Sequence, residues 1–368
     1  MSPTTPELNV AAPETAIAAA LKEKGPSLEL KMHRGARTPL RFSGIAAELE
    51  AVRKGAAVFD LGFRTVLRAT GKDRVRWLNG MITQTVKGLA AGQTGYTLVL
   101  NPQGRIQGDG DLLVRDEELL LETDRSQVER LLSHLKRYII MDVVQLEALE
   151  GVTVVGLAGP KAADALARVG AAAPEAGGFR AAEIAGVPVT LVGAYGPVVP
   201  RFAVHVAAEP AAEVWRALAE AGAVPCGIAA MEDFRVLEGV PQFDRDISDK
   251  NLPQETGLMR ALNFTKGCYI GQEIVERIRA RATVHRALRQ FELQGDVPPV
   301  GAGEKIELRA GDAAVGELTS VARFDLPDLQ KTLALGIARV EALESGAPLT
   351  YNGGTATPLA VADSSPES

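Results

Sequence analysis

The stretch Lys266-Gly267-Cys268-Tyr269-Ile270-Gly271-Gln272-Glu273 holds the most unusual local choice of residues in this 368-residue chain. Two glycines bracket Cys268 and Tyr269, and glycine lets the backbone turn sharply or approach a ligand closely. Lys266 lies two positions before Cys268, where a cation can stabilise a thiolate, and a glycine-bounded segment can leave the sulfur exposed. We therefore expect Cys268 to be a reactive residue with Lys266 as its electrostatic partner. The alternative is a small, buried, structural cysteine.

Other cysteine and metal chemistries find no support in the sequence. Cys226 is the only other cysteine, so a disulfide framework and a four-thiolate cluster are excluded. It lies in Val224-Pro225-Cys226-Gly227 without charged neighbours, which predicts a structural role. The glycines of residues 104–110 lack the Gly-Lys-Ser/Thr ending of a phosphate loop. We expect no metal site, because no motif with zinc-ligand spacing or an oriented catalytic base contains the four histidines, His33, His134, His205 and His285.

Three arginines, Arg277, Arg279 and Arg281, follow the motif at every second position. Side chains alternate between faces in an extended strand, so these three would point to one side. In a chain of net negative charge, such a face is a local cationic surface that can capture the anionic tail of a ligand. The alternative is a solvated edge strand that its charges protect from pairing with other strands.

The composition indicates a soluble globular protein, with 46% hydrophobic and 23% charged residues. The net charge of −6 argues against a general nucleic-acid binder, which needs a surplus of cations. The longest apolar stretches are shorter than a membrane span requires. Residues 1–24 lack a secretory signal pattern, and the two cysteines fit a reducing compartment. We therefore predict a cytoplasmic protein with neither nucleic acid nor membrane as a partner.

Upstream of the motif, two similar series of elements indicate an α+β fold. Residues 45–54 repeat apolar side chains at helical spacing, and a β-like run at 64–69 leads through a turn into a helix around 75–82. Two further runs, 97–100 and 111–114, flank the turn Asn101-Pro102-Gln103-Gly104, and another run at 119–122 precedes a helix at 126–138. The pattern restarts with a strand at 152–157 and a helix at 161–169. Two related α+β lobes are expected.

The end of the chain has a different pattern, with short β-like runs at 290–293, 305–308, 314–320 and 332–337. These runs predict a small C-terminal β-barrel or sandwich. The expected organisation is a flexible N-terminal arm over residues 1–41 with one helical stretch at 14–24, a first lobe over 42–150, a second lobe over 151–285, a barrel over 286–360 and a disordered tail over 361–368.

Residues 266–273 resemble the K-G-C-Y-x-G-Q-E signature of the YgfZ family, a branch of the superfamily of T-proteins, the aminomethyltransferases of glycine cleavage. The resemblance spans about residues 42–345. It implies an α+β fold of two intertwined lobes and a C-terminal β-barrel around a central hole that binds tetrahydrofolate. The other stretches that carry the resemblance are 51–53, 59–60, 100–104, 159–160, 235–239, 253–258 and 316–320.

The resemblance also implies site residues. T-proteins carry an aspartate, after a turn like 101–104, that contacts the folate where the one-carbon unit is transferred. Asp109 is the best match, and Asp111 is the alternative because Gly108-Asp109-Gly110-Asp111 leaves the register ambiguous. A turn aspartate that binds its own backbone is the structural alternative for either. The further positions expected to bind the folate are Tyr195, Arg235, Glu255, Tyr269, Gln272, Arg277 and Arg279.

Two departures from the T-proteins favour the YgfZ branch. Residues 192–197 lack the glutamate with which T-proteins read the pterin ring. T-proteins also lack the motif cysteine and usually have lysine at the position of Gln272. The expected function is therefore that of a tetrahydrofolate-binding factor that supports assembly or repair of iron-sulfur proteins, with such proteins or their assembly factors as partners. The alternatives are an aminomethyltransferase that uses a lipoylated carrier protein, and a folate-binding scaffold without turnover.

Overall fold

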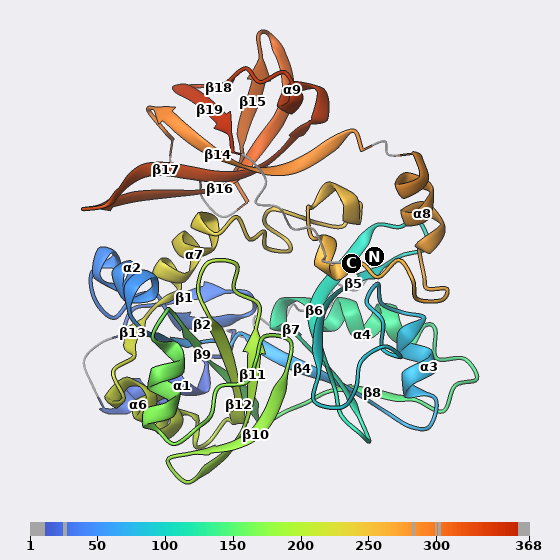
Figure 1. The fold of residues 1–368 in the computed structure, drawn as a ribbon, viewed down its shortest axis with the longest axis vertical. Helices are drawn as coiled ribbons and strands as arrows, with labels where there is room; N and C mark the ends of the chain where they lie inside the picture. The colour runs from blue at the N-terminus through green and yellow to red at the C-terminus, as the bar shows by residue number, and fades with distance from the viewer. Residues whose placement is uncertain (1–11, 25–27, 282–283, 299, 301–302, 360–368) are drawn as a thin grey trace, which may run out of the picture.

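The computed structural model describes residues 12–24, 28–281, 284–298, 300 and 303–359. Figure 1 shows two lobes, each a β-sheet with helices, and a closed β-barrel above them. The α+β fold of two lobes and a C-terminal barrel that the sequence predicts is confirmed.

The first lobe is built on a five-stranded sheet of order β5-β6-β7-β4-β8 with antiparallel pairing throughout. Leu131 and Leu135 repeat at helical spacing on α4 and bury one face of this helix in the core of the lobe. The elements are β4 (Arg64–Thr70), α3 (Arg74–Asn79), β5 (Thr94–Leu100), β6 (Ile106–Val114), β7 (Leu119–Asp124), η1 (Arg125–Gln127), α4 (Val128–Lys136) and β8 (Gln145–Ala148).

The second lobe is built on a six-stranded sheet of order β10-β11-β12-β9-β3-β13, in which β13 and β3 pair in parallel. Leu166 of α5 and Trp215 of α6 lie in its main core. The elements are α2 (Ile45–Lys54), β3 (Ala57–Asp60), β9 (Val152–Ala158), α5 (Ala162–Arg168), β10 (Phe179–Ile184), β11 (Val187–Ala194), β12 (Arg201–Ala207), α6 (Ala211–Glu220), β13 (Val224–Cys226) and α7 (Ile228–Leu237).

The two lobes are intertwined through β3. This strand precedes the first lobe in the chain, yet it lies in the second sheet between β9 and β13. The chain therefore starts the second lobe, builds the whole first lobe and then returns. Boundaries at residues 42–150 and 151–285 cannot describe this order, because β3 pairs with β9, from Ala57 with Ala158 to Asp60 with Val155, across the whole first lobe.

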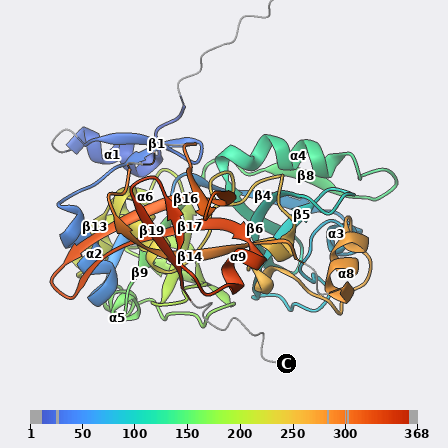
Figure 2. The ribbon, with the colours of Figure 1, turned by 90° about the horizontal axis from the view of Figure 1, so that it is seen from above.

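Residues 12–24 and 28–41 form a helix and a hairpin that pack on the second lobe, in contrast to the flexible arm that the sequence predicts over 1–41. Helix α1 (Ala16–Lys24) buries Ile17 completely, in the same core cluster as Trp215 of α6. The hairpin β1 (Leu30–His33) and β2 (Ala36–Pro39) follows. Figure 2 shows α1 and α4 along one side of the molecule. Residues 1–11 and the expected disordered tail 361–368 lie outside the described residues.

The barrel closes in the order β14-β17-β16-β15-β18-β19. It packs on α7, where Phe234 shares a core cluster with Phe324 and Leu335. The expected β-like runs coincide with its strands, except that β15 begins one residue later than the run 305–308. The elements are β14 (Arg286–Gly295), β15 (Ile306–Ala310), β16 (Ala313–Leu326), β17 (Leu329–Arg339), α9 (Val340–Glu344), β18 (Leu349–Tyr351) and β19 (Gly354–Pro358).

The segment that carries the three arginines is the helix α8 (Gln272–Arg281), which corrects the expected strand. Residues that favour helices, among them Gln272, Glu273 and Glu276, outnumber β-branched ones here. In a helix, positions 277 and 279 lie about 200° apart, so the period of two does not create one cationic face. The remaining helical turns are η2 (Pro253–Glu255) and η3 (Met259–Ala261). No helix in the described part of the chain is long and apolar enough to cross a membrane.

Candidate functional site

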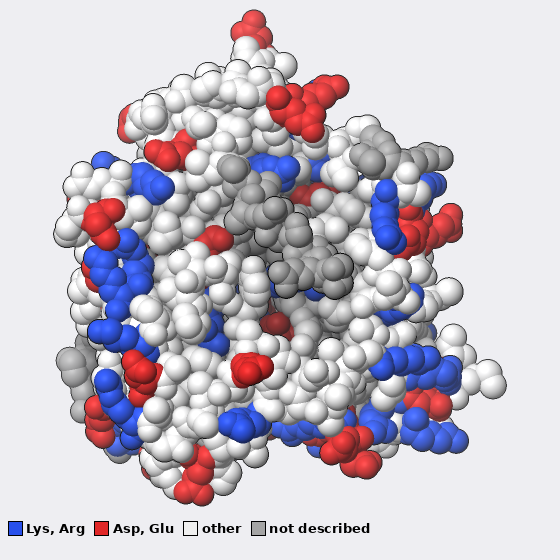
Figure 3. Space-filling view, in the orientation of Figure 1, with Lys and Arg blue, Asp and Glu red and all other residues white. Residues whose placement is uncertain are grey.

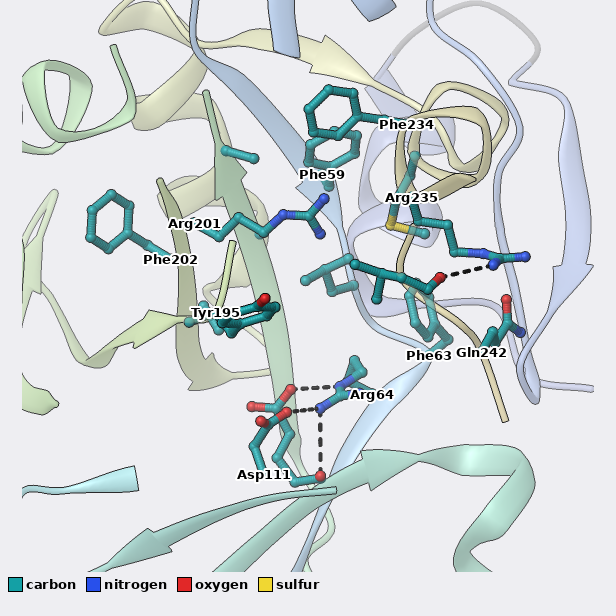
Figure 4. A pocket seen from close by; sticks show the side chains of 18 of the residues that line it. Phe59, Phe63, Arg64, Asp111, Tyr195, Arg201, Phe202, Phe234, Arg235 and Gln242 are labelled. Carbon is teal, nitrogen blue, oxygen red and sulfur yellow. Dashed lines mark hydrogen bonds and ion pairs between the residues drawn. The ribbon is translucent and has the colours of Figure 1, made fainter. Parts of the chain in front are cut away.

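A cavity lies between the two lobes, and its wall takes residues from both sheets and from α7. The cavity has a volume of about 220 Å³ and is open to solvent. Figure 4 shows Arg64 and Asp111 at one end of the cavity and Phe59 and Phe234 at the other. The Arg201 guanidinium lies beside the two rings, 5.6 Å from the Phe234 centroid, so both ends of the cavity carry charged side chains.

Asp109 is a fixed hydrogen-bond acceptor in the wall of this cavity. It lies on β6 and is only 7% exposed. Tyr96 Oη donates to Asp109 Oδ2 at 2.6 Å, and Gln127 Nε2 donates to Asp109 Oδ1 at 2.8 Å. Burial, together with the charge of Asp109, raises the pKa of Tyr96 well above its ordinary value, so the phenol stays a donor. The Asp109 carboxylate binds other side chains, which argues against the turn aspartate that binds its own backbone.

Asp111 faces the same cavity but belongs to an ion-pair network around Arg64. The Arg64 guanidinium donates to Asp111 Oδ2 at 2.9 Å and to Glu122 Oε1 at 2.6 Å. Burial raises the pKa of Asp111, whereas Arg64 and His205 hold the pKa of Glu122 well below its usual range despite its burial. His205 of β12 contacts Glu122 of β7, so this network also joins the two lobes. Sequence reasoning left Arg64, Glu122 and His205 out of the site.

Arg260 lies between two tyrosine rings of the cavity wall. Its guanidinium carbon is 4.2 Å from the ring centroid of Tyr96 and 4.1 Å from that of Tyr195. Tyr96 comes from the first lobe and Tyr195, which is 50% exposed, from the second. Cation–π contacts hold the Arg260 guanidinium, yet it donates no hydrogen bond to any residue that the structure describes, and its Nε is buried. Tyr195 was expected in the site; Arg260 and Tyr96 were not.

Arg235 lines the cavity, but its guanidinium is already engaged. It donates to Glu232 Oε2 at 2.9 Å, to Asp246 Oδ2 at 2.7 Å and to Ser320 Oγ at 2.8 Å. Ser320 belongs to β16 of the barrel. The main contacts of Arg235 therefore tie α7 to the barrel, and few of its donors are left for a ligand.

Lys266 does not face the sulfur of Cys268 as a thiolate partner, which corrects that expectation. Its ammonium is buried and donates to the backbone carbonyls of Asn79 at 2.6 Å, Ile82 at 2.6 Å and Gln84 at 2.7 Å. An ammonium has three N–H donors, so none is left for a thiolate. Burial lowers the pKa of Lys266 to about 7, whereas the three carbonyls favour its charged form.

The two cysteines differ as the sequence suggested. Cys268 is free and exposed, whereas Cys226 is free and buried in the core that α7 shares with the barrel. Burial and the nearby Glu48 raise the pKa of Cys226 far above its ordinary value. A buried thiol of raised pKa is unreactive, so Cys268 is the cysteine that reagents and partners can reach.

Tyr269 and Gln272 lie outside the cavity wall. Tyr269 is buried in a core cluster with Leu98 and Ile106, and its Oη has no hydrogen-bond partner among the described residues. The Lys266 ammonium lies 5.0 Å from its ring centroid. Gln272 begins α8, and its backbone N–H donates to the carbonyl of Tyr269. Both residues therefore support the motif rather than line the cavity.

Glu255, Arg277 and Arg279 are also outside the cavity. Glu255 accepts the backbone N–H of Leu252 at 3.0 Å and so caps the turn η2. Arg277 borders a separate hollow beside the turn 101–104, whereas the Arg279 guanidinium lies 4.4 Å from the ring centroid of Phe264. The structure thus brings together Asp109, Tyr195 and Arg235 of the expected ligand set but separates them from these three.

The described residues contain no group of three or more His, Cys, Asp or Glu side chains placed to hold a metal ion. The lysines and arginines on the face shown in Figure 3 gather at its left edge and lower right and alternate with acidic side chains. They form no continuous cationic field on this face.

Comparisons with known proteins agree with this fold. The family described as the GCVT N-terminal domain matches residues 20–266. An aminomethyltransferase of Nostoc sp. is 30% identical over 278 residues, which cover 71% of this chain and 72% of that protein. The tRNA-modifying protein YgfZ of Yersinia pestis is 29% identical over 291 residues, which cover 75% of this chain and 80% of that protein.

A solved structure has the same fold over nearly the whole chain. The glycine cleavage system aminomethyltransferase T from Bartonella henselae superposes with a TM-score of 0.84 at 18% identity, covering 95% of this chain and 97% of that one. At this identity the likeness concerns the fold alone.

Proposed function

The chain belongs to the T-protein superfamily as a YgfZ-type member, and from this membership we propose that it binds tetrahydrofolate in the cavity between its lobes and supports assembly or repair of iron-sulfur proteins. The observation that carries the proposal is the meeting of Tyr96, Asp109, Tyr195 and Arg260 in one cavity. These residues come from both lobes and from η3.

The chemistry of these side chains suits a reduced folate. Its pterin is a planar ring with donors and acceptors on its edges, and an aromatic side chain such as the half-exposed Tyr195 can stack on a ring of this kind. The Asp109 carboxylate can accept from a ring N–H or an amine, and the Arg260 guanidinium can donate to a carbonyl or carboxylate. We propose that Asp109 lies beside the reacting carbon of the folate. Asp111 is less available to a ligand, because its carboxylate is paired with Arg64.

Cys268 is the proposed reactive group of the factor. Its exposure allows a thiolate to attack a disulfide or an electrophilic carbon, or to hold iron or a sulfur species. A thiol is a poor hydrogen-bonding partner for a pterin, and Cys268 lies outside the cavity wall. We therefore assign folate binding to the cavity and the activity toward iron-sulfur proteins to Cys268.

Complementation tests this division of roles. In cells that lack the protein, Cys268→Ser should fail to restore the activity of iron-sulfur enzymes, whereas the matched Cys226→Ser should restore it. Purified Cys268→Ser should bind tetrahydrofolate as the wild type does. Full complementation by Cys268→Ser would remove the chemical basis of the assembly role.

A second candidate is an aminomethyltransferase, since relatives of about 30% identity carry that name. It would use Asp109 to hold the folate amine and a lipoylated carrier protein as donor. Formation of methylenetetrahydrofolate, ammonia and the free carrier thiol from tetrahydrofolate and an aminomethylated carrier would favour it, and such turnover should not require Cys268. The YgfZ relatives are named for tRNA, but a net charge of −6 speaks against direct binding of RNA phosphates by this chain.

A further inference from the structure

The Lys266 ammonium donates hydrogen bonds to three backbone carbonyls of residues 79–84. We term this segment the 79–84 turn. The three hydrogen bonds to Asn79, Ile82 and Gln84 are 2.6 to 2.7 Å long, and Lys266 forms no ion pair with any described residue. A buried ammonium without a carboxylate is costly unless its donors are satisfied. The three carbonyls therefore stabilise the buried Lys266 ammonium. They also fix the first residue of the segment 266–271, which we term the Cys268 loop.

The end of the Cys268 loop is fastened to the same turn. The backbone N–H of Ile270 donates to the carbonyl of Gly80 at 3.0 Å, and that of Asn263, just before the loop, donates to the carbonyl of Thr83 at 3.1 Å. Cys268 lies between these fastenings and is exposed. The position of its sulfur thus depends on the 79–84 turn.

Arg260 of the cavity is held by this turn as well. Gln84 Nε2 donates to the carbonyl of Arg260 at 3.1 Å, and Thr83 Oγ1 donates to the carbonyl of Ala261 at 2.6 Å. The backbone carbonyl of Gln84 also accepts a hydrogen bond from the Lys266 ammonium. The backbone of η3 and the Lys266 ammonium are therefore fixed by adjacent groups of a single turn.

The Arg260 side chain lies in the cavity wall, where its guanidinium can form hydrogen bonds with a bound ligand. Its guanidinium lies between Tyr96 and Tyr195 and has no hydrogen-bond partner among the described residues. A ligand with carbonyl or carboxylate acceptors gives it partners and so holds η3 more firmly. A ligand that orders one segment lowers the entropic cost of ordering a segment bonded to it.

We infer that Lys266 is a positioning residue for Cys268, and that the 79–84 turn couples the Cys268 loop to Arg260 in the cavity. The coupling rests on the proposed function, because the ligand that we assign to the cavity is tetrahydrofolate. A bound ligand then makes Cys268 less mobile and less reactive. Because coupling between two sites is reciprocal, modification of Cys268 should in turn change the affinity of the cavity for its ligand.

The rate at which iodoacetamide alkylates Cys268 tests the inference. The full-length protein carries Cys226→Ser in every arm, so that Cys268 is its single thiol. Saturating tetrahydrofolate, with occupancy followed by calorimetry, should slow alkylation about fivefold or more, as for an ordinary coupling free energy. The Arg260→Gln variant, at its own saturating concentration, should lose most of this protection.

Lys266→Ala tests the positioning role without any ligand. It should speed alkylation at every pH and leave the midpoint of the pH–rate profile in place, whereas loss of a thiolate partner would raise that midpoint. Propylammonium, which replaces the deleted atoms, should restore the slow rate when sodium chloride at equal ionic strength does not. Lys87→Ala, which removes an exposed lysine nearby, is the matched control and should leave the rate unchanged.

Three results would overturn the inference. A saturable heat of tetrahydrofolate binding with unchanged alkylation would exclude the coupling and leave the proposed function intact. If saturating tetrahydrofolate slowed the alkylation of Cys268 in both Arg260→Gln and Lys266→Ala as much as in the parent protein, the ligand would shield the thiol directly. A raised midpoint in Lys266→Ala would make Lys266 a thiolate partner. Absence of any heat would remove the proposed function and the coupling together, while the Lys266→Ala arm would still decide the positioning role.

Discussion

Gly271 packs directly against Asn101, so that the cysteine motif and the turn 101–104 touch although 170 residues separate them. A Cβ atom on Gly271 would lie 2.6 Å from the Asn101 carbonyl oxygen and 3.0 Å from Cα of Gly104. Gly271 also has φ of +81°, a conformation that favours glycine. The contact joins the two stretches that carry the resemblance most clearly, and β6, which follows the turn, carries Asp109 into the cavity.

Gly271→Ala should destabilise the protein. The positive φ costs about 1 kcal/mol for an alanine and the contact with backbone atoms adds to it, so we expect a loss of about 2 to 4 kcal/mol in the free energy of unfolding. Urea denaturation measures it. The matched control is Gly267→Ala, because a Cβ at Gly267 would meet no atom within 4 Å. Equal stability of the two variants would contradict the contact.

Asp109→Asn should weaken tetrahydrofolate binding by roughly 10- to 100-fold, the value of a hydrogen bond to a charged acceptor. Asn retains an acceptor for Tyr96 and changes the volume little. Asp111→Asn is the comparison, because Arg64 already engages Asp111 in an ion pair. Calorimetric titration of both variants decides between the two registers, and a larger loss in Asp111→Asn would transfer the role to that residue.

Asp60 should make stability depend on pH. It is buried, accepts a hydrogen bond from Thr15, and burial raises its pKa from 3.8 to about 6. In that range the folded state binds more protons than the unfolded state, so the free energy of unfolding falls as pH rises from about 4 to 6. The fall should amount to about 3 kcal/mol and should be absent in Asp60→Asn. Parallel stability curves for the two proteins would refute this assignment.

Elements with an apolar stripe at clear spacing could be predicted from the sequence. The helix at 45–54 forms as expected because Leu49 and Val52 repeat at helical spacing and are buried. The strand expected at 277–281 is wrong because Arg277 and Arg279 are exposed charges, whereas Val275 buries its side chain within a helix. Charges on a surface carry no information about the core, so they do not define secondary structure.

The site could be predicted only where the resemblance marked single residues. Asp109 and Tyr195 do line the cavity. The stack of Tyr96, Arg260 and Tyr195 could not be foreseen, because its members come from three segments that meet only in the folded protein. Lys266 faces away from Cys268 for a similar reason: its acceptors lie more than 180 residues earlier in the chain.

Calorimetric titration of the wild-type protein with tetrahydrofolate tests the central claim most directly. The account predicts a saturable heat with one site per chain and a melting temperature that rises with ligand concentration, because a ligand specific for the folded state raises its stability. The absence of both heat and thermal stabilisation, at ligand concentrations far above the micromolar range, would contradict folate binding in the cavity between the lobes.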